Sequence, residues 1–318
     1  MNTLTSAFAS VNLQRFPLRN NETLQAWDAA DELLLKHLAQ TNHLSLKDNS
    51  AENSKIIILN DAFGSLACSL STFQVTSWGD SHLAHSALLH NAQANQLAST
   101  PQCLASTSEL SDEYDIALIK IPKTLALLEQ QLIQLKTHLH TNSLVIAAGM
   151  TKYMQRSHFA LFERYLGPTS TSLAVKKARL IFPTLKQQTP PTPCPYPSQY
   201  YDNDVGLTLC NHANVFSREN LDIGARFMIQ QFNQLPTMSS SPLRIVDLGC
   251  GNGVLGIMAK KQLEQVDKNR GKQVYFIDES YMAIASAKKI FTEHLDRQPT
   301  ASFLLAIASH RLRCQTLI

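Results

Sequence analysis

The sequence has little that would anchor the chain in a membrane or cross-link it. No apolar run in the 318 residues approaches the roughly 18 that a membrane-spanning helix needs. The N-terminus has neither the basic start nor the long apolar stretch of a secretory signal. The six cysteines lie far apart and form no C-x-x-C pair, which disfavours a zinc site or a disulfide framework. These absences predict a soluble, cytoplasmic protein with reduced thiols.

A strong excess of charge of either sign is also missing. Lysine and arginine total 28 and aspartate and glutamate 25, which leaves a net charge of +3. This balance permits a nucleic-acid partner but does not indicate one, because charge-based recognition requires clustered basic residues. Lys120 and Lys123, with Lys176, Lys177 and Arg179, could form such an RNA-facing patch. Scattered solvent-facing side chains are an equally good interpretation.

A metal centre is not predicted either. His82, His85 and His90 are close together in the sequence, but only the first two share one face of a helix. No carboxylate or thiolate is spaced to complete a site around them. We therefore expect no bound metal ion.

Proline is concentrated in one place and divides the chain. Six of the 13 prolines fall between Pro183 and Pro197. Because proline fixes φ and lacks an amide donor, this stretch cannot continue a helix or a central strand. Hydrophobic residues make up 44% of the chain, which allows a core on each side. We predict an N-terminal domain over 1–182, a linker over 183–199 and a C-terminal domain over 200–318.

Both halves alternate short β-rich runs with helical patterns. The predicted strands are 55–59, 73–78, 115–120, 143–148, 244–248 and 274–277. The predicted helices are 23–38, 82–96, 124–138, 216–232, 254–265 and 281–291. Strands that alternate with helices indicate βαβ units, a parallel sheet and hence the α/β class.

The two halves can be laid over one another. In the first, residues 58–64 (Ile-Leu-Asn-Asp-Ala-Phe-Gly) lead to 78–80 (Trp-Gly-Asp) at the end of the next strand. In the second, residues 245–251 (Ile-Val-Asp-Leu-Gly-Cys-Gly) lead to 277–279 (Ile-Asp-Glu). This order predicts a duplicated nucleotide-binding fold whose first copy has lost its glycines.

The clearest chemical signal is the glycine loop of the second half. Gly249, Gly251 and Gly253 lie between a strand and a helix. Because glycine has no Cβ and tolerates positive φ, the backbone amides there can approach a ligand closely. The spacing is G-C-G-N-G after Asp247, not the G-x-G-x-x-G of dinucleotide folds. This favours S-adenosylmethionine over NAD, with Asp278 accepting hydrogen bonds from the ribose. A plain strand-to-helix turn is the alternative interpretation.

A longer set of motifs resembles one family. Residues 211–226 (Asn-His-Ala-Asn-Val-Phe-Ser-Arg-Glu-Asn-Leu-Asp-Ile-Gly-Ala-Arg), the glycine loop and 278–280 (Asp-Glu-Ser) are similar to the guanine-N2 ribosomal RNA methyltransferases, in particular the large-subunit 23S rRNA methyltransferase G group. The resemblance extends to 117–131 and covers about residues 1–291. It implies two tandem Rossmann-like class I methyltransferase folds, the first degenerate and involved in RNA recognition. The second binds S-adenosylmethionine and methylates a guanine of 23S ribosomal RNA.

The resemblance also assigns residues to the cofactor. The segment that covers its methionine end is matched by Phe216, Ser217, Leu221, Asp222 and Gly224. The glycine loop is matched by Asp247, Gly249, Cys250, Gly251, Asn252 and Gly253, and the ribose-binding acid by Asp278. On physical grounds alone, the first of these segments favours an ordinary helix start with Ser217 as its N-cap.

One family motif is absent. The family places Asn-Pro-Pro and an aromatic residue after the fourth strand, where they bind the guanine amine and stack on the extruded base. No Asn-Pro-Pro occurs in the 318 residues. The duplication places its degenerate counterpart at 120–123 (Lys-Ile-Pro-Lys), so the equivalent in the second half is expected at about residue 318.

The resemblance therefore predicts a C-terminally truncated member whose second fold is incomplete. Residues 292–318 lack the strand and the acidic residue expected there and resemble a truncated or frame-shifted tail. We expect impaired or absent methyl transfer and assign no catalytic residue. The alternatives are a non-catalytic RNA-binding remnant and a guanine-N2 methyltransferase of 16S ribosomal RNA.

Overall fold

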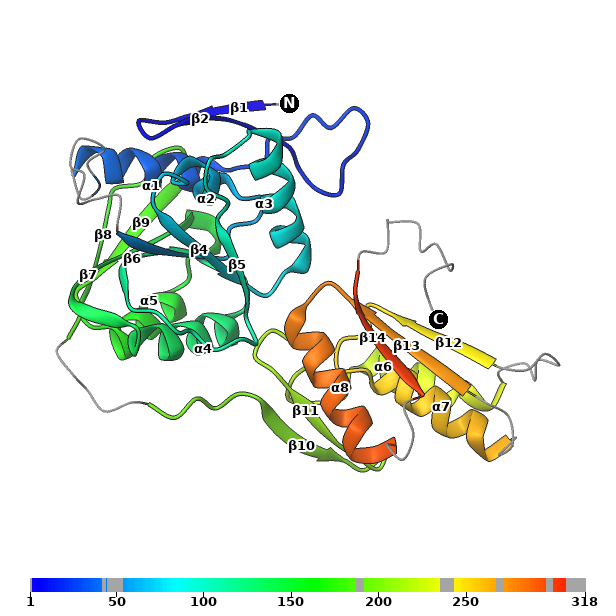
Figure 1. The fold of residues 1–318 in the computed structure, drawn as a ribbon. Helices are drawn as coiled ribbons and strands as arrows, with labels where there is room; N and C mark the ends of the chain where they lie inside the picture. The colour runs from blue at the N-terminus through cyan, green and yellow to red at the C-terminus, as the bar shows by residue number, and fades with distance from the viewer. Residues whose placement is uncertain are drawn as a thin grey trace. The chain divides into compact units, whose positions relative to one another are not determined.

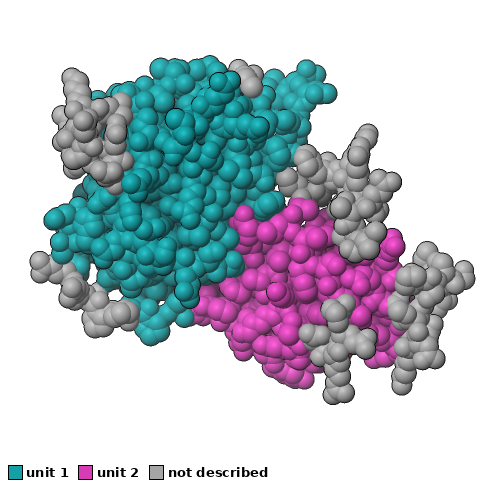
Figure 2. Space-filling model, viewed as in Figure 1, with its two compact units in different colours: residues 1–194 teal, residues 195–318 magenta. Residues whose placement is uncertain are grey.

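The chain forms two compact units, residues 1–194 (unit 1) and 195–318 (unit 2), shown in Figure 2. The computed structural model describes residues 2–41, 44, 54–186, 192–234, 243–266, 272–295 and 300–306. Part of the predicted linker, 187–191, lies outside the described residues. None of the described helices is long and apolar enough to cross a membrane.

Unit 1 is built on a seven-stranded sheet in the order β5-β4-β3-β6-β7-β9-β8. Its strands are β3 (Lys55–Leu59), β4 (Gln74–Gly79), β5 (Gln102–Ala105), β6 (Tyr114–Lys120), β7 (Leu139–Met150), β8 (Thr169–Thr171) and β9 (Ala178–Pro183). The first five in spatial order run parallel, as predicted, whereas β9 is antiparallel to both neighbours. The parallel prediction fails at this edge because the connection between β8 and β9 is too short for a parallel crossover.

Helices cover both faces of this sheet (Figure 1). One face carries α1 (Ala29–Gln40), α2 (Ser65–Ser69) and α3 (His82–Ala94), and the other carries α4 (Leu125–Lys136) and α5 (Arg156–Tyr165). Ile56 and Ile58 of β3 belong to the first core, and Ile57 and Leu59 belong to the second. Burial on both faces explains the uninterrupted apolar sequence of this strand.

The N-terminal segment of unit 1 differs from its prediction. A hairpin of β1 (Asn2–Thr5) and β2 (Ser10–Leu13) comes first. α1 begins at Ala29, six residues later than predicted. Asp28 sets this start, because its carboxylate accepts hydrogen bonds from the first turn while Asp31 accepts one from the Asp28 amide at 2.8 Å. This reciprocal capping box fixes the end of the helix.

Unit 2 contains a parallel sheet in the order β12-β13-β14 and a hairpin of β10 and β11. Its elements are β10 (Ser198–Asp202), β11 (Leu207–Asn211), α6 (Ile223–Gln230), β12 (Leu243–Leu248), α7 (Val254–Val266), β13 (Lys272–Asp278), α8 (Tyr281–Leu295) and β14 (Ala301–Leu305). One face of the sheet packs against α7 and α8 through Ile245, Val274 and Phe276. The predicted α/β class is therefore confirmed in both units.

The prediction that residues 292–318 contain no further strand is wrong. α8 continues to Leu295, and β14 pairs in parallel with β13. The ring of Phe303 stacks on that of Phe276, with 5.1 Å between their centroids. The short apolar sequence of β14 has no periodicity of its own, and its pairing with β13 determines that it is a strand. Residues 307–318 lie outside the described residues.

The two units repeat one strand-loop-helix arrangement. The Asn60 amide donates to the Trp78 carbonyl after β3, and the Gly249 amide donates to the Ile277 carbonyl after β12. Asn60 and Gly249 both have positive φ, of 62° and 70°, and so do the glycines four residues later, Gly64 and Gly253. This match in register supports the predicted duplication.

Candidate cofactor site

The glycine loop joins β12 to α7 and leaves its backbone accessible. Gly249 and Gly251 have φ of 70° and 54°, a left-handed conformation that side chains disfavour. A Cβ built on either residue meets no heavy atom within 4 Å. Open space therefore lies beside the two glycines, which is the condition for a ligand to approach their amides.

Two other glycines serve packing instead. A Cβ on Gly253 would lie 2.8 Å from Ala287 Cβ of α8, and one on Gly256 would lie 2.6 Å from Phe276 Cε1 of β13. These positions let α7 approach the strand and the neighbouring helix closely. The structure thus places Gly253, a predicted cofactor residue, behind the loop. The sequence gives no sign of this role for Gly256, because its contact with Phe276 forms only where α7 packs on β13.

Asp278 lies at the carboxyl end of β13 and contacts the loop directly. Its Oδ2 accepts a hydrogen bond from the Gly251 amide, and its Oδ1 accepts one from the Ser280 amide, both at 3.0 Å. The carboxyl ends of parallel strands meet at one edge of a sheet, which is where such folds bind ligands. The tertiary structure therefore brings the predicted acid and the predicted loop together.

Asp247 is buried beneath the loop. Its Oδ2 accepts a hydrogen bond from the Gly256 amide at 2.8 Å, which ties α7 to β12. Burial raises the pKa of Asp247 to about 6, against the Gly256 hydrogen bond and with the help of the Asp278 charge. Asp247 is a predicted cofactor residue, but its described hydrogen bond is to the backbone of α7. Asp247 therefore positions α7, and the loop before it, on β12.

The raised pKa of Asp247 predicts a pH-dependent stability difference. Because the folded-state pKa lies above the ordinary value, protonated Asp247 stabilises the fold below about pH 4, and this contribution is lost as the pH rises through about 6. Asp247→Asn keeps an oxygen acceptor and avoids the loss. We expect the variant to gain up to about 3 kcal/mol on the wild type between about pH 4 and pH 7, at about 1.4 kcal/mol per pKa unit. Urea denaturation followed by circular dichroism measures the difference, and a constant difference across this range would contradict the prediction.

Asn252 and Asn211 connect the loop to the preceding segment. Asn252 Nδ2 donates to Asn211 Oδ1 at 2.9 Å, and Asn252 Oδ1 accepts from the Val254 amide at 3.2 Å, which caps α7. Asn211, fully buried at the end of β11, donates through Nδ2 to the Arg218 carbonyl at 2.9 Å. Asn211 therefore links the glycine loop to the segment that follows β11. It is the first residue of the motif over residues 211–226, but that motif alone does not predict this link.

The segment from Phe216 to Gly224 does not form the helix start predicted from residue 216. Ser217 has a φ of 52°, and its Oγ donates to the Asn220 carbonyl at 2.8 Å. Ser217 as N-cap is therefore wrong; the N-cap is Asp222, whose carboxylate accepts from the Ala225 amide at 3.0 Å. The Phe216 side chain is 79% exposed.

Two of the predicted residues belong to the core of unit 2. Leu221 and Cys250 are both buried there. Burial raises the pKa of the Cys250 thiol, and its amide donates to the Ile277 carbonyl at 3.1 Å. These two buried side chains anchor the segment from Phe216 to Gly224 and the glycine loop to the core of unit 2.

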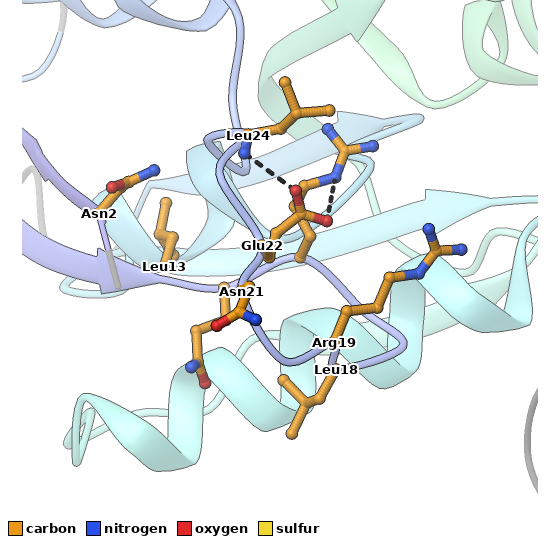
Figure 3. Close-up of a pocket in the computed structure, with 9 residues that line it drawn as sticks. Asn2, Leu13, Leu18, Arg19, Asn21, Glu22 and Leu24 are labelled. Atoms are coloured by element: carbon orange, nitrogen blue, oxygen red, sulfur yellow. Dashed lines mark hydrogen bonds and ion pairs between the residues drawn. The ribbon is translucent and has the colours of Figure 1, made fainter.

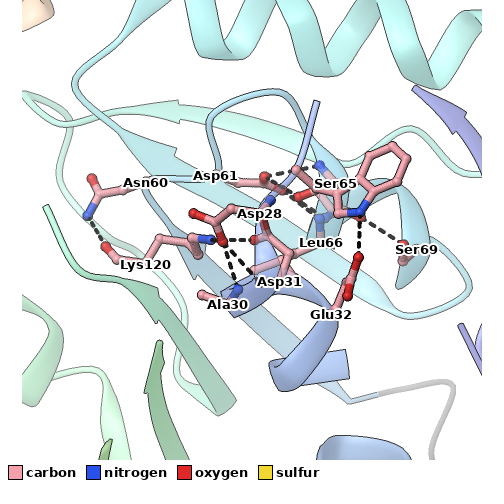
Figure 4. Close-up of polar contacts among 12 residues, drawn as sticks. Asp28, Ala30, Asp31, Glu32, Asn60, Asp61, Ser65, Leu66, Ser69 and Lys120 are labelled. Carbon is pink, nitrogen blue, oxygen red and sulfur yellow. Dashed lines mark hydrogen bonds and ion pairs between the residues drawn. The ribbon is translucent and has the colours of Figure 1, made fainter. Parts of the chain in front are cut away.

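The corresponding loop of unit 1 is filled by the unit's own side chains (Figure 4). Asp61 is buried and accepts hydrogen bonds from the amides of Ser65, Leu66 and Ala67 at 2.9–3.1 Å. Asn60 and Gln131 exchange two side-chain hydrogen bonds of 2.9 Å. Burial raises the pKa of Asp61. This helix N-terminus is thus occupied by a carboxylate of the chain itself.

Lys120 does not contribute to an exposed basic patch. Its Nζ lies 2.7 Å from Oδ1 of both Asp28 and Asp31, and its side chain is only 14% exposed. Burial opposes the charge, but the two carboxylates raise the pKa of Lys120. The partners lie at the start of α1, Asp28 as its N-cap and Asp31 in its first turn, about 90 residues earlier in the chain, so sequence spacing gives no sign of them. Lys123 is exposed, which leaves the predicted patch without its first member.

A hollow of about 270 Å³ lies beside the N-terminal hairpin of unit 1 (Figure 3). Glu22 accepts a hydrogen bond from the Leu24 amide at 2.9 Å and faces Arg15 Nε at 3.8 Å. The lining residues are Asn2, Leu13, Gln14, Arg15, Leu18, Arg19, Asn21, Glu22 and Leu24. None of the predicted site residues is among them. Within the described part of the chain, no group of three His, Cys, Asp or Glu side chains could hold a metal ion.

The chain matches two family models and many curated proteins. The "RLMG N-terminal domain" matches residues 1–187, and the "Methyltransferase small domain" matches residues 206–303. Ribosomal RNA large subunit methyltransferase G of Pseudomonas paraeruginosa is 45% identical over 92% of this chain and 74% of its own length. The protein of the same name from Pseudomonas putida is 42% identical over 99% of this chain and 79% of its own length. This chain therefore spans about three quarters of such relatives.

A solved structure shares the fold. The T. thermophilus 16S rRNA N2 methyltransferase, in complex with AdoMet and guanosine, superposes with a TM-score of 0.68 at 16% identity. The match covers 96% of this chain and 74% of that one, so it includes both units. On the sequence matches over nearly its whole length, the chain belongs to the ribosomal RNA large subunit methyltransferase G family.

Proposed function

We propose that this chain serves the S-adenosylmethionine-dependent methylation of the exocyclic N2 of a guanine in 23S ribosomal RNA, in the cytoplasm. The observation that carries the proposal is the open backbone at Gly249 and Gly251 beside the carboxylate of Asp278. The family supplies the reaction class, because the curated relatives are named ribosomal RNA large subunit methyltransferase G.

The residues of the loop fit an adenosyl cofactor. A ribose presents two hydroxyl donors, and a half-buried carboxylate at the end of β13 is a suitable acceptor for them. The loop amides can approach the ligand because Gly249 and Gly251 have no Cβ. The segment from Phe216 to Gly224 is held beside the loop by the hydrogen bonds of Asn211 and would cover the other end of the cofactor. When bound, S-adenosylmethionine supplies an electrophilic methyl group.

The glycine loop and Asp278 orient the cofactor, but we assign no residue to binding the guanine amine. Orientation and proximity supply most of the rate in such transfers, and the Asn-Pro-Pro motif that would position the base is absent from the 318 residues. We therefore expect residues 1–318 to bind the cofactor and to transfer methyl groups slowly. Purified protein, labelled S-adenosylmethionine and unmodified 23S or 16S ribosomal RNA test this. A rate equal to that of the P. putida relative would overturn the expected impairment, and transfer to 16S RNA alone would overturn the substrate.

Asp278→Asn is expected to weaken S-adenosylmethionine binding by about tenfold or more, because one charged acceptor of the ribose hydroxyls is lost. The amide oxygen can still accept from the Gly251 amide, so the melting temperature should change little. Isothermal titration calorimetry measures the affinity. Glu279→Gln is the matched control, since it removes the same charge from an exposed neighbour. Equal affinity in the two variants would remove Asp278 from the proposed site.

A further inference from the structure

Three connecting segments of unit 1 lie at one edge of its sheet. Residues 121–124 follow β6, residues 151–156 follow β7, and residues 172–177 join β8 to β9. β6 and β7 are parallel neighbours, so both end at this edge, and the antiparallel β9 begins there. The Thr151 amide donates to the Lys177 carbonyl at 2.8 Å, which ties the second segment to the third.

All the charged residues of these segments are positive. No aspartate or glutamate occurs in them, and their exposed charged side chains are Lys123, Lys152, Arg156, Lys176 and Lys177. Among the described residues, the one carboxylate that pairs with any of the five is that of Glu32, 2.8 Å from Lys176 Nζ. We call the three segments together the basic edge. Its excess of exposed positive charge attracts a phosphate backbone.

One exposed aromatic side chain lies among these cations. Tyr153 is 47% exposed, and Lys152 Nζ lies 4.6 Å from the centroid of its ring. The hydrogen bond from Lys152 lowers the pKa of the Tyr153 hydroxyl, and the charge of Lys123 adds to this shift. Cations from two segments therefore lie near one ring. Proteins that bind single-stranded nucleic acids combine the same two features, because bases stack on aromatic rings while positive side chains hold the backbone.

We propose that the basic edge binds a single-stranded segment of RNA, with a base stacked on Tyr153 and phosphates held by Lys123, Lys152 and Lys177. A single strand fits because its bases are accessible, whereas a duplex keeps them stacked and paired. The identity of this RNA as ribosomal rests on the proposed function. The surface differs from the patch predicted from the sequence, because Lys120 is buried and the end of β7 contributes Lys152 and Tyr153 instead.

The test is the fluorescence anisotropy of a labelled, unstructured RNA of about 12 nucleotides with the full chain, without S-adenosylmethionine. We expect a Kd of about 1–100 µM at about 0.15 M salt, and weaker binding of the same RNA in a duplex. Tyr153→Ala should raise the Kd by about 5- to 100-fold, because the stacking ring is lost. Tyr153→Phe keeps the ring and should bind as the wild type does. RNA that carries 4-thiouridine should crosslink to residues 151–156.

The salt dependence of binding measures the phosphate contacts. Lys123→Ala and Lys177→Ala should each reduce the slope of log K against log salt by about 0.7, the value for one phosphate of a single strand. Lys136→Ala is the control and should leave the slope unchanged, because Lys136 ends α4 just before β7 begins, at the opposite edge of the sheet. Circular dichroism verifies the fold of each variant.

No binding, binding that is insensitive to Tyr153→Ala, or a preference for the duplex would overturn the proposal. Tighter binding to phosphatidylserine vesicles than to the RNA, or crosslinks confined to unit 2, would overturn it as well. Calorimetry with S-adenosylmethionine separates this result from the proposed function. A chain that binds RNA through Tyr153 but does not bind the cofactor would overturn the proposed function alone.

Discussion

Lys120→Met is expected to lower the free energy of unfolding of unit 1 by about 3–5 kcal/mol, because removing one partner of a buried ion pair leaves uncompensated charge. The ammonium is shared by Asp28 and Asp31, both at 2.7 Å. Burial raises the pKa of Asp31 to about 6 even with the ammonium in place, and the charges of Asp28 and Asp61 add to this shift. The charge of Lys120 thus stabilises the ionised form of three carboxylates, Asp28, Asp31 and Asp61.

Tryptophan fluorescence during urea denaturation measures this loss, because both tryptophans, Trp27 and Trp78, lie in unit 1. Lys176→Met is the control: its Nζ pairs with Glu32 at 2.8 Å, but its side chain is 70% exposed. A surface pair of that kind contributes about 1 kcal/mol at most. Adding Asp31→Asn to the Lys120 variant should restore part of the loss. If the two lysine variants lost similar free energies of unfolding, the buried ion pair would contribute no more to stability than the surface pair, and the prediction would be wrong.

Gly253→Ala and Gly64→Ala are each expected to cost about 2–5 kcal/mol, the sum of about 1–2 for a left-handed residue and about 1–3 for overpacking. The φ angles are 79° and 77°. A Cβ at Gly253 meets Ala287 Cβ at 2.8 Å, and one at Gly64 meets Leu88 Cα at 2.9 Å. Neither obstacle is the far end of a flexible side chain, so relief requires movement of a helix.

Gly251→Ala separates strain from packing. Its φ of 54° gives the same kind of strain, but its Cβ would meet no heavy atom within 4 Å. We expect a cost of only about 1–2 kcal/mol, together with a large loss of affinity for S-adenosylmethionine. Denaturation followed by circular dichroism and calorimetry with the cofactor measure the two effects. If Gly251→Ala destabilised as much as Gly253→Ala while cofactor binding survived, the division of the glycines into ligand-facing and packing positions would be wrong.

Most strands of the seven-stranded sheet of unit 1 and of the three-stranded sheet of unit 2 could be predicted from the sequence. β3 and β6 each contain a continuous apolar run of four residues buried on both faces, and such runs are typical of parallel sheets. β14 was missed because five weakly patterned residues become a strand only by pairing with β13. The start of α6 was misplaced for a related reason. Serine is a common N-cap, but Ser217 donates to the Asn220 carbonyl, and Asp222 caps the helix.

The sequence by itself determined the α/β class, the repeated strand-loop-helix unit and the family, because glycine spacing and apolar periodicity are local properties of the chain. The tertiary structure alone decided which glycines face open space and which face a helix. It also decided that Asn211 joins the loop to its neighbouring segment, and that Lys120 is buried between two carboxylates at the start of α1. The contacts of Asn211 with Asn252 and of Lys120 with Asp28 join residues about 40 and about 90 positions apart. Their formation depends on how helices and strands pack, which no local pattern specifies.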